Sequence, residues 1–213
     1  MNADRIARLY RWIEYATFGP ALQRRRVAFL LEVADARRVL VLGDGDGRFL
    51  ERLVKQNPRA RFDYVDLSGR MLELARERAG TDLVAYHQAD ALKIALPERC
   101  FDLIVTHFFL DCFDEAGAAR LVERAARAAC PNARWLISEF RESSRWGALW
   151  LWVIYAFFGI ATGLETRRLI DHHPLLLRHG FRVMHSESAW RGLLASELWA
   201  RCGSGAPLAR ALD

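Results

Sequence analysis

A run of four apolar residues followed by alternating glycines is the feature that most constrains the fold of this chain. Residues 39–50 read VLVLGDGDGRFL. A short, continuously apolar run is typical of a parallel strand buried on both faces. Glycines after it let the backbone turn sharply and approach a ligand closely, and the N-terminus of the following helix favours an anionic group. The run therefore predicts a strand, a ligand-binding loop and a helix.

An acid at the end of the next predicted strand narrows the ligand. Asp66 lies 23 positions beyond Gly43 (66 minus 43). A carboxylate there can accept hydrogen bonds from both hydroxyls of a ribose, although Asp66 could also be a turn residue that caps the following helix. Together the loop and the acid predict a nucleoside-containing cofactor. A dinucleotide fingerprint would need its third glycine at position 48, where this chain has Arg48.

Strands and helices alternate along the rest of the chain, which predicts an α/β fold with a doubly wound, parallel sheet in one domain. The expected strands cover 39–42, 61–66, 83–87, 101–106, 134–139, 181–188 and 194–200, and the expected helices cover 48–56, 68–79, 115–129 and 165–179. Only five residues, 189–193, separate the last two strands, so they should pair as an antiparallel hairpin. Two further helices are expected over 4–34, the second burying Val27, Leu30 and Leu31.

Four segments in order resemble the class I S-adenosylmethionine-dependent methyltransferases. The GxGxG spacing of Gly43, Gly45 and Gly47 resembles their first motif. The stretch DLSGRMLELA from Asp66 resembles the DxSxxML segment of the ubiquinone/menaquinone-type small-molecule enzymes, and QADA over 88–91 and FDLIV over 101–105 match in turn. The resemblance covers roughly residues 35–140. It implies a Rossmann-like, seven-stranded, mostly parallel sheet whose last strand is antiparallel, with helices on both faces, and S-adenosylmethionine as cofactor.

The resemblance also implies which residues hold the cofactor. The glycine loop should lie against the methionyl part, where Asp44 could merely suit the tight turn or could meet the ammonium group. Asp66 should bind the ribose, and Asp90 the adenine amino group. Asp90 could instead be a loop acid that precedes a helix. The expected cofactor-binding residues are Gly43, Asp44, Gly45, Gly47, Asp66, Leu67, Met71, Asp90, Ala91 and His107.

Two residues after the fourth predicted strand are candidates for catalysis. Reactive groups line the carboxyl ends of strands in an open α/β sheet, which places His107 and Asp111 near the transferable methyl group. His107 could act as a general base, pack in the core or contact the cofactor through its backbone. Asp111 could orient the substrate or serve as a turn or cap residue. The chain has no Asp/Asn-Pro-Pro-Tyr sequence, which argues against a nucleic-acid base as acceptor.

Composition adds few further constraints. A net charge of +5 does not by itself indicate a nucleic-acid partner, and the basic runs 24–26 and 37–38 are interpreted as solvated faces. The four cysteines are scattered, and the spacing of His172, His173 and His185 does not establish a metal site, so no metal is expected. His172 and His173 precede Pro174 and are interpreted as a helix-starting turn. The beginning of the chain lacks the apolar core of a signal peptide, which favours the cytoplasm.

An uncharged, aromatic-rich segment over 146–163 suggests the acceptor. Its 18 residues approach the lower length of a membrane span, but a span would place a bilayer between strands of one sheet. A helix buried in the core is a second possibility, but we favour a lid over the acceptor that also contacts a lipid surface or a second subunit. The predicted regions are a helical cap (1–34), a cofactor-binding core (35–140), a lid (141–180) and a closing hairpin (181–200).

The predicted function is methyl transfer from S-adenosylmethionine to an oxygen or carbon atom of a small hydrophobic or aromatic acceptor. Two alternatives stay open. One is a nicotinamide-dependent oxidoreductase, which the missing glycine at Arg48 disfavours. The other is a non-catalytic, cofactor-binding partner protein.

Overall fold

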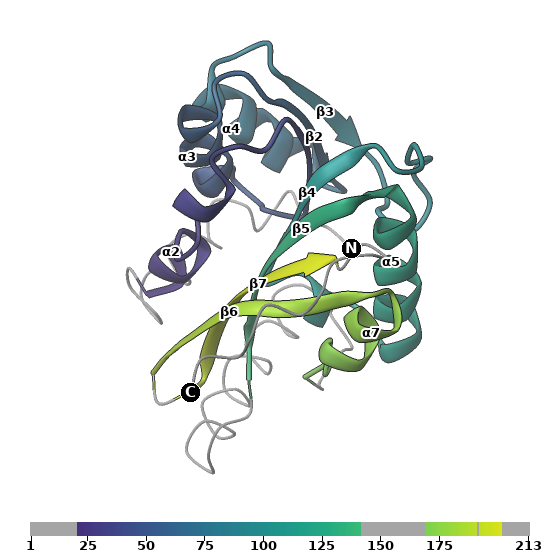
Figure 1. Ribbon diagram of the computed structural model, residues 1–213. Coiled ribbons are helices and arrows are strands. Elements are labelled where there is room, and N and C mark those ends of the chain that lie inside the picture. The colour runs from purple at the N-terminus through teal and green to yellow at the C-terminus, as the bar shows by residue number, and fades with distance from the viewer. Residues whose placement is uncertain (1–20, 142–168, 191, 202–213) are drawn as a thin grey trace.

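Seven strands form one sheet in the order β3-β2-β1-β4-β5-β7-β6 (Figure 1). The computed structural model describes residues 21–141, 169–190 and 192–201. The strands are β1 (Arg38–Leu42), β2 (Arg61–Asp66), β3 (Val84–Gln88), β4 (Phe101–His107), β5 (Ala129–Phe140), β6 (Phe181–Ala189) and β7 (Leu194–Arg201). Strands β1 to β5 pair in parallel, whereas β7 runs antiparallel to both β5 and β6. The predicted fold class, including the closing hairpin, is confirmed.

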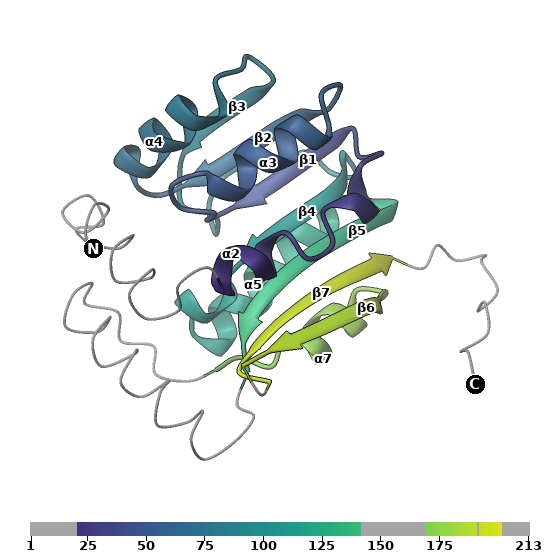
Figure 2. The ribbon, with the colours of Figure 1, turned by 90° about the vertical axis from the view of Figure 1, so that its left-hand side faces the viewer.

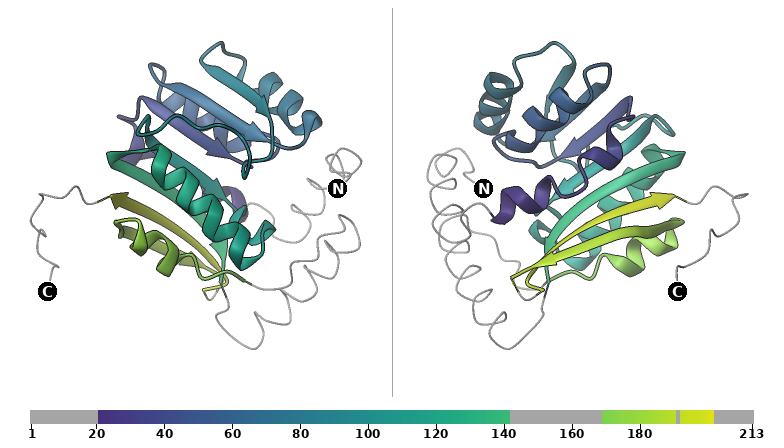
Figure 3. Two further views of the ribbon diagram at one scale, coloured as in Figure 1. Left: turned by 90° about the vertical axis from the view of Figure 1, so that its right-hand side faces the viewer. Right: turned by 60° about the vertical axis from the view of Figure 1, so that its left-hand side comes forward.

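Helices cover both faces of the sheet. One face carries α2 (Ala21–Arg26), α3 (Arg48–Gln56) and α4 (Gly69–Ala79) (Figure 2). The other carries α5 (Glu115–Ala128) and α7 (His173–Arg178) (Figure 3). Local sequence sets the helix starts: the Ser68 hydroxyl accepts a hydrogen bond from the Met71 amide, and the Asp114 carboxylate accepts one from the Gly117 amide.

The first strand is buried on both sides, as its uninterrupted apolar run predicts. Val39 and Val41 join the core beneath α3 and α4, while Leu40 and Leu42 join the core beneath α5. The sheet therefore separates two apolar layers, and the loops at its carboxyl edge are anchored to a rigid base.

The N-terminal helical region differs from its prediction. Helix α2 ends at Arg26, and a single 3-10 turn follows at Leu31–Val33. Leu31 is 76% exposed rather than buried, because this turn directs Phe29 and Val33 to the core instead. Arg26 is only 6% exposed, contrary to the predicted solvated face, and its guanidinium lies over the Phe108 ring.

The helix expected over 165–179 is also shorter where the structure describes it. Residues 169–172 are not helical, and α7 begins at His173 after His172 in the N-cap position. Pro174 explains this start, because proline lacks an amide hydrogen and is tolerated only in the first helical turn. The predicted helix-starting turn at His172 and His173 is confirmed.

Several predictions fall outside the described residues, namely the first helix of 4–34 and the apolar segment 146–163. The predicted division of the chain into cap, core, lid and hairpin therefore stays a prediction. In the described parts of the chain, no helix has the length and hydrophobicity that crossing a bilayer requires.

Candidate functional site

The carboxyl ends of β1, β2, β4 and β5 meet at one edge of the sheet. In the sheet, β2 and β3 lie on one side of β1, and β4 and β5 lie on the other side of β1. Ligands of open α/β sheets bind at such a switch point, outside the carboxyl ends of the strands. The glycine motif follows β1, Asp66 ends β2, His107 ends β4 and Asp111 lies in the loop after β4.

The three motif glycines all have positive φ but meet different surroundings. Their φ angles are 66° for Gly43, 69° for Gly45 and 76° for Gly47. A Cβ on Gly43 would lie 2.1 Å from the Phe109 ring, and one on Gly47 would lie 2.6 Å from the Cα of Ala75 in α4. A Cβ on Gly45 would meet no described atom within 4 Å. Gly45 is thus the position of the loop that leaves space for a ligand.

We expect Gly45→Ala to weaken cofactor binding about tenfold while lowering the free energy of unfolding by only about 1 kcal/mol. The added methyl fits the free protein, so only its left-handed backbone is unfavourable, but the methyl fills space on the ligand side. Calorimetric titration with S-adenosylhomocysteine and urea denaturation measure the two effects. Unchanged affinity would place the ligand elsewhere.

Asp44 is a buried carboxyl group with one unsatisfied oxygen. Its Oδ2 accepts a hydrogen bond from the Leu50 amide at 3.2 Å, while Oδ1 has no hydrogen-bond partner among the described residues. Burial raises the pKa of Asp44 to about 7, although the nearby charge of Arg26 opposes the rise. A buried, unpaired carboxylate oxygen requires a donor, preferably a cationic one. This fits the ammonium group of a methionyl moiety.

Asp46 stabilises the glycine loop through ion pairs rather than facing a ligand. Its carboxylate pairs with Arg48 at 2.9 Å and with Arg78 at 3.0 Å. Arg48 opens α3 and Arg78 lies near the end of α4, so Asp46 links the glycine loop to both helices.

Asp66 ends β2 beside the glycine loop. Its Oδ1 accepts a hydrogen bond from the Ser68 amide at 2.9 Å, and Ser68 rather than Asp66 caps α4. Asp66 thus takes part in the turn that precedes α4, and its ribose-binding role stays a prediction. Leu67 is exposed and Met71 is half-buried, so both side chains can contact a ligand at this edge.

Asp90 follows β3 and is engaged in its own turn. Its Oδ1 accepts a hydrogen bond from the Leu92 amide at 2.9 Å, and Lys93 lies 3.4 Å from Oδ2. Ala91 is buried against the core on the α5 face. The loop-acid interpretation of Asp90 describes these contacts, and its adenine role stays a prediction.

His107 is buried on the α3 face of the sheet. Its ring meets the Phe49 ring edge-on at 4.6 Å, and neither ring nitrogen has a hydrogen-bond partner among the described residues. Burial, followed by the charge of Arg26, holds the pKa of His107 well below 6.5. The imidazole is thus neutral and 2% exposed, as a packing histidine would be. The general-base and cofactor-contact roles of His107 and the substrate-orienting role of half-buried Asp111 stay predictions.

Glu139, at the end of β5, is a site residue that the sequence reasoning missed. Its Oε1 accepts hydrogen bonds from the amides of Phe109 at 3.1 Å and Leu110 at 2.9 Å. Its Oε2 has no partner among the described residues, and burial, then the charge of Asp111, raises the pKa of Glu139 well above its usual value. Glu139 holds the loop whose Phe109 ring covers Gly43. The sequence signal that could have identified Glu139 is its position as an acid at the end of an apolar strand, which is also the position of Asp66.

Comparison with known proteins places this geometry in a family context. Residues 39–132 match the family described as "Methyltransferase domain". A demethylmenaquinone methyltransferase of Deinococcus radiodurans is 29% identical over 119 residues, which cover 55% of this chain and 48% of the relative. A polyamine aminopropyltransferase 2 of Bacillus anthracis is 33% identical over 88 residues, covering 36% of this chain and 24% of the relative. The matches thus span about half or less of these curated relatives.

The fold is also found among solved structures. An S-adenosylmethionine-dependent methyltransferase from Mesorhizobium loti superposes with a TM-score of 0.65 at 23% identity, covering 87% of this chain and 98% of that one. The predicted resemblance to the class I methyltransferases is confirmed, and S-adenosylmethionine is the cofactor that the matched domain implies. The open position at Gly45 and the unsatisfied oxygen of Asp44 fit that cofactor.

Proposed function

We propose that this protein transfers a methyl group from S-adenosylmethionine to an oxygen or carbon atom of a small hydrophobic or aromatic acceptor. The observation that carries the proposal is the glycine loop of β1 with Asp44 and Asp66 at a sheet switch point, inside the segment that matches a methyltransferase domain. When bound, the cofactor supplies an electrophilic methyl group on a sulfonium. The chain would hold it through the open loop at Gly45, the carboxylate of Asp44 and the carboxylate of Asp66.

Aromatic side chains beside the glycine loop support an apolar acceptor. The Phe109 ring, which contacts Gly43, meets the Phe113 ring edge-on at 5.1 Å, and Phe108 packs on Phe140 at 5.1 Å. Such rings exclude water and orient an apolar reactant, and alignment for in-line attack is most of what methyl transfer requires. The D. radiodurans relative is named for a quinone-type acceptor, demethylmenaquinone.

Several finer parts of the hypothesis stay predictions. They are the cytoplasmic location and the role of 146–163 as a lid over the acceptor that also contacts a lipid surface or a second subunit. An oxygen or acidic carbon nucleophile must lose a proton. The Glu139 carboxyl contacts the loop after β4 through the Leu110 amide, whereas the His107 imidazole packs on Phe49.

We expect Asp66→Ala to weaken S-adenosylhomocysteine binding about thirtyfold, or about 2 kcal/mol, because two hydrogen bonds to a charged acceptor are lost. Isothermal titration calorimetry of the wild type and the variant measures this change. Asp63→Ala is a matched control, because Asp63 lies earlier on the same strand and pairs with His87. Its affinity should equal that of the wild type.

The same titrations separate the alternatives. Binding of NADH without S-adenosylhomocysteine would overturn the proposal in favour of an oxidoreductase. Binding of S-adenosylhomocysteine with no methyl transfer to any quinone, phenol or activated carbon acid would favour the non-catalytic partner protein.

A further inference from the structure

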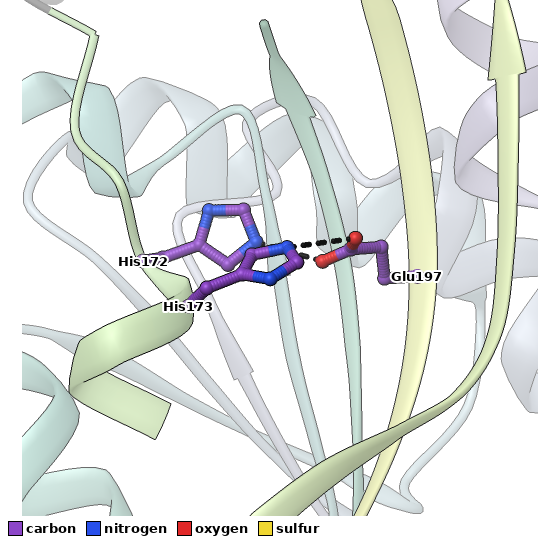
Figure 4. A group of neighbouring side chains, drawn as sticks. All are labelled: His172, His173 and Glu197. Atoms are coloured by element: carbon purple, nitrogen blue, oxygen red, sulfur yellow. Dashed lines mark hydrogen bonds and ion pairs between the residues drawn. The ribbon is translucent and has the colours of Figure 1, made fainter. Parts of the chain in front are cut away.

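Three side chains that the proposed function does not use converge between α7 and β7. His172 and His173 stand at the start of α7, and Glu197 lies on the neighbouring strand β7. Both imidazoles point at the carboxylate (Figure 4). The His172 Nε2 lies 2.8 Å from Oε2, and the His173 Nε2 lies 3.0 Å from Oε1. All three ligand atoms lie within 4.8 Å of one another.

The Arg141 guanidinium contacts both His173 and Glu197 in this cluster. An Arg141 Nη2 lies 2.5 Å from the His173 Nε2 and also contacts the Glu197 Oε1. A guanidinium only donates, so a hydrogen bond from Arg141 uses the His173 Nε2 as an acceptor, which is also the form of a histidine nitrogen that binds a metal. Two acceptor atoms 3.0 Å apart therefore share one positively charged group. This is the arrangement that a bound cation requires.

The Glu197 carboxylate is fixed in orientation by a neighbouring side chain. Glu197 is only 2% exposed, and the Trp199 indole donates a hydrogen bond to its Oε2 at 2.9 Å. Outer contacts of this kind fix the orientation of metal ligands. The same contacts would also stabilise a purely structural ion pair, so the accessibility of the site decides between the two.

The histidines open onto a pocket of about 370 Å³. The pocket is lined by Phe140, Arg141, Ile170, Asp171, His172 and His173. Arg141 has 35% of its side chain exposed, so its guanidinium can leave the cluster for solvent. Three protein ligands with a fourth side facing a pocket match an open zinc site, whereas structural zinc sites are closed by four protein ligands.

We propose that His172, His173 and Glu197 bind a divalent transition-metal ion, with Zn²⁺ as the expected one, in the place now taken by the Arg141 guanidinium. Two imidazoles and one carboxylate suit this class of ion. Tetrahedral bonds of about 2.1 Å set neighbouring ligand atoms about 3.4 Å apart. The observed separations of 2.8 Å and 3.0 Å need to widen by only about half an ångström. The fourth position would take a water molecule or an oxygen of a ligand in the pocket.

The test is metal binding by the whole chain, freed of any histidine tag and stripped with a chelator. Equilibrium dialysis with Zn²⁺ should give one ion per chain, and Co²⁺ should give the visible absorption of a tetrahedral site. His173→Ala, whose side chain is half-buried, should bind at least tenfold more weakly. Arg141→Gln should bind about tenfold more tightly, because the competing positive charge is removed.

His185→Gln is the matched control, since His185 is an exposed histidine of β6 outside the cluster. It should bind like the wild type, and circular dichroism should show that every variant is folded. The proposal is overturned if neither the wild type nor Arg141→Gln binds metal at micromolar concentration. It is also overturned if His173→Ala and His185→Gln bind equally. No cofactor or methyl acceptor is present, so the result is independent of the proposed methyl transfer.

Discussion

The affinity for S-adenosylhomocysteine is expected to rise about a hundredfold between pH 5 and pH 8. The reason is Asp44, whose pKa burial raises to about 7 in the free protein. Pairing with an ammonium group lowers a carboxyl pKa by about 1–3 units. Below pH 7 the carboxyl must therefore release a proton when the ligand binds, and affinity falls up to about tenfold per pH unit until the bound-state pKa is reached. Above pH 7 the affinity levels off.

Two controls isolate this effect. Adenosine lacks the amino-acid part of the ligand, so its affinity should stay nearly constant over the same range. Asp44→Asn should bind S-adenosylhomocysteine more weakly at pH 8 and lose the pH dependence. If S-adenosylhomocysteine and adenosine respond to pH alike, Asp44 does not meet the ammonium group, and its burial serves the start of α3 through the Leu50 amide.

The loops that would bind the cofactor could be predicted from the sequence, because residues close together in the chain determine their structure. Positive φ at Gly43, Gly45 and Gly47 requires glycine, and a buried parallel strand requires an uninterrupted apolar run. Both requirements can be recognised directly in a short stretch of sequence. The same holds for Ser68, whose place before α4 follows from its capping hydroxyl.

The parts that escaped prediction depend on contacts between distant segments. Glu139 reaches the loop after β4 only because β5 pairs in parallel with β4, with His107 opposite Ser138. Glu197 meets the two histidines because β7 runs antiparallel beside β5, with Glu197 opposite Ile137. A spacing of 25 residues between His172 and Glu197 carries no such information. Arg26 was predicted as solvated because its aromatic partner lies far along the chain, at Phe108.

Replacing Gly47 with alanine is expected to lower the free energy of unfolding by about 3 kcal/mol. The φ of 76° adds about 1 kcal/mol for a residue with a Cβ. The new methyl would also lie 2.6 Å from the Cα of Ala75, and backbone atoms of α4 can yield only if the two helices separate, which adds about 1–3 kcal/mol. For a chain of this size the melting temperature should fall by about 6–12 °C. Gly45→Ala is the matched comparison, because its φ of 69° is similar but its Cβ meets no described atom. Equal losses in the two variants would show that backbone conformation alone requires glycine here, whereas a loss about three times larger at Gly47 would show that the close packing of α3 on α4 holds the cofactor loop in place.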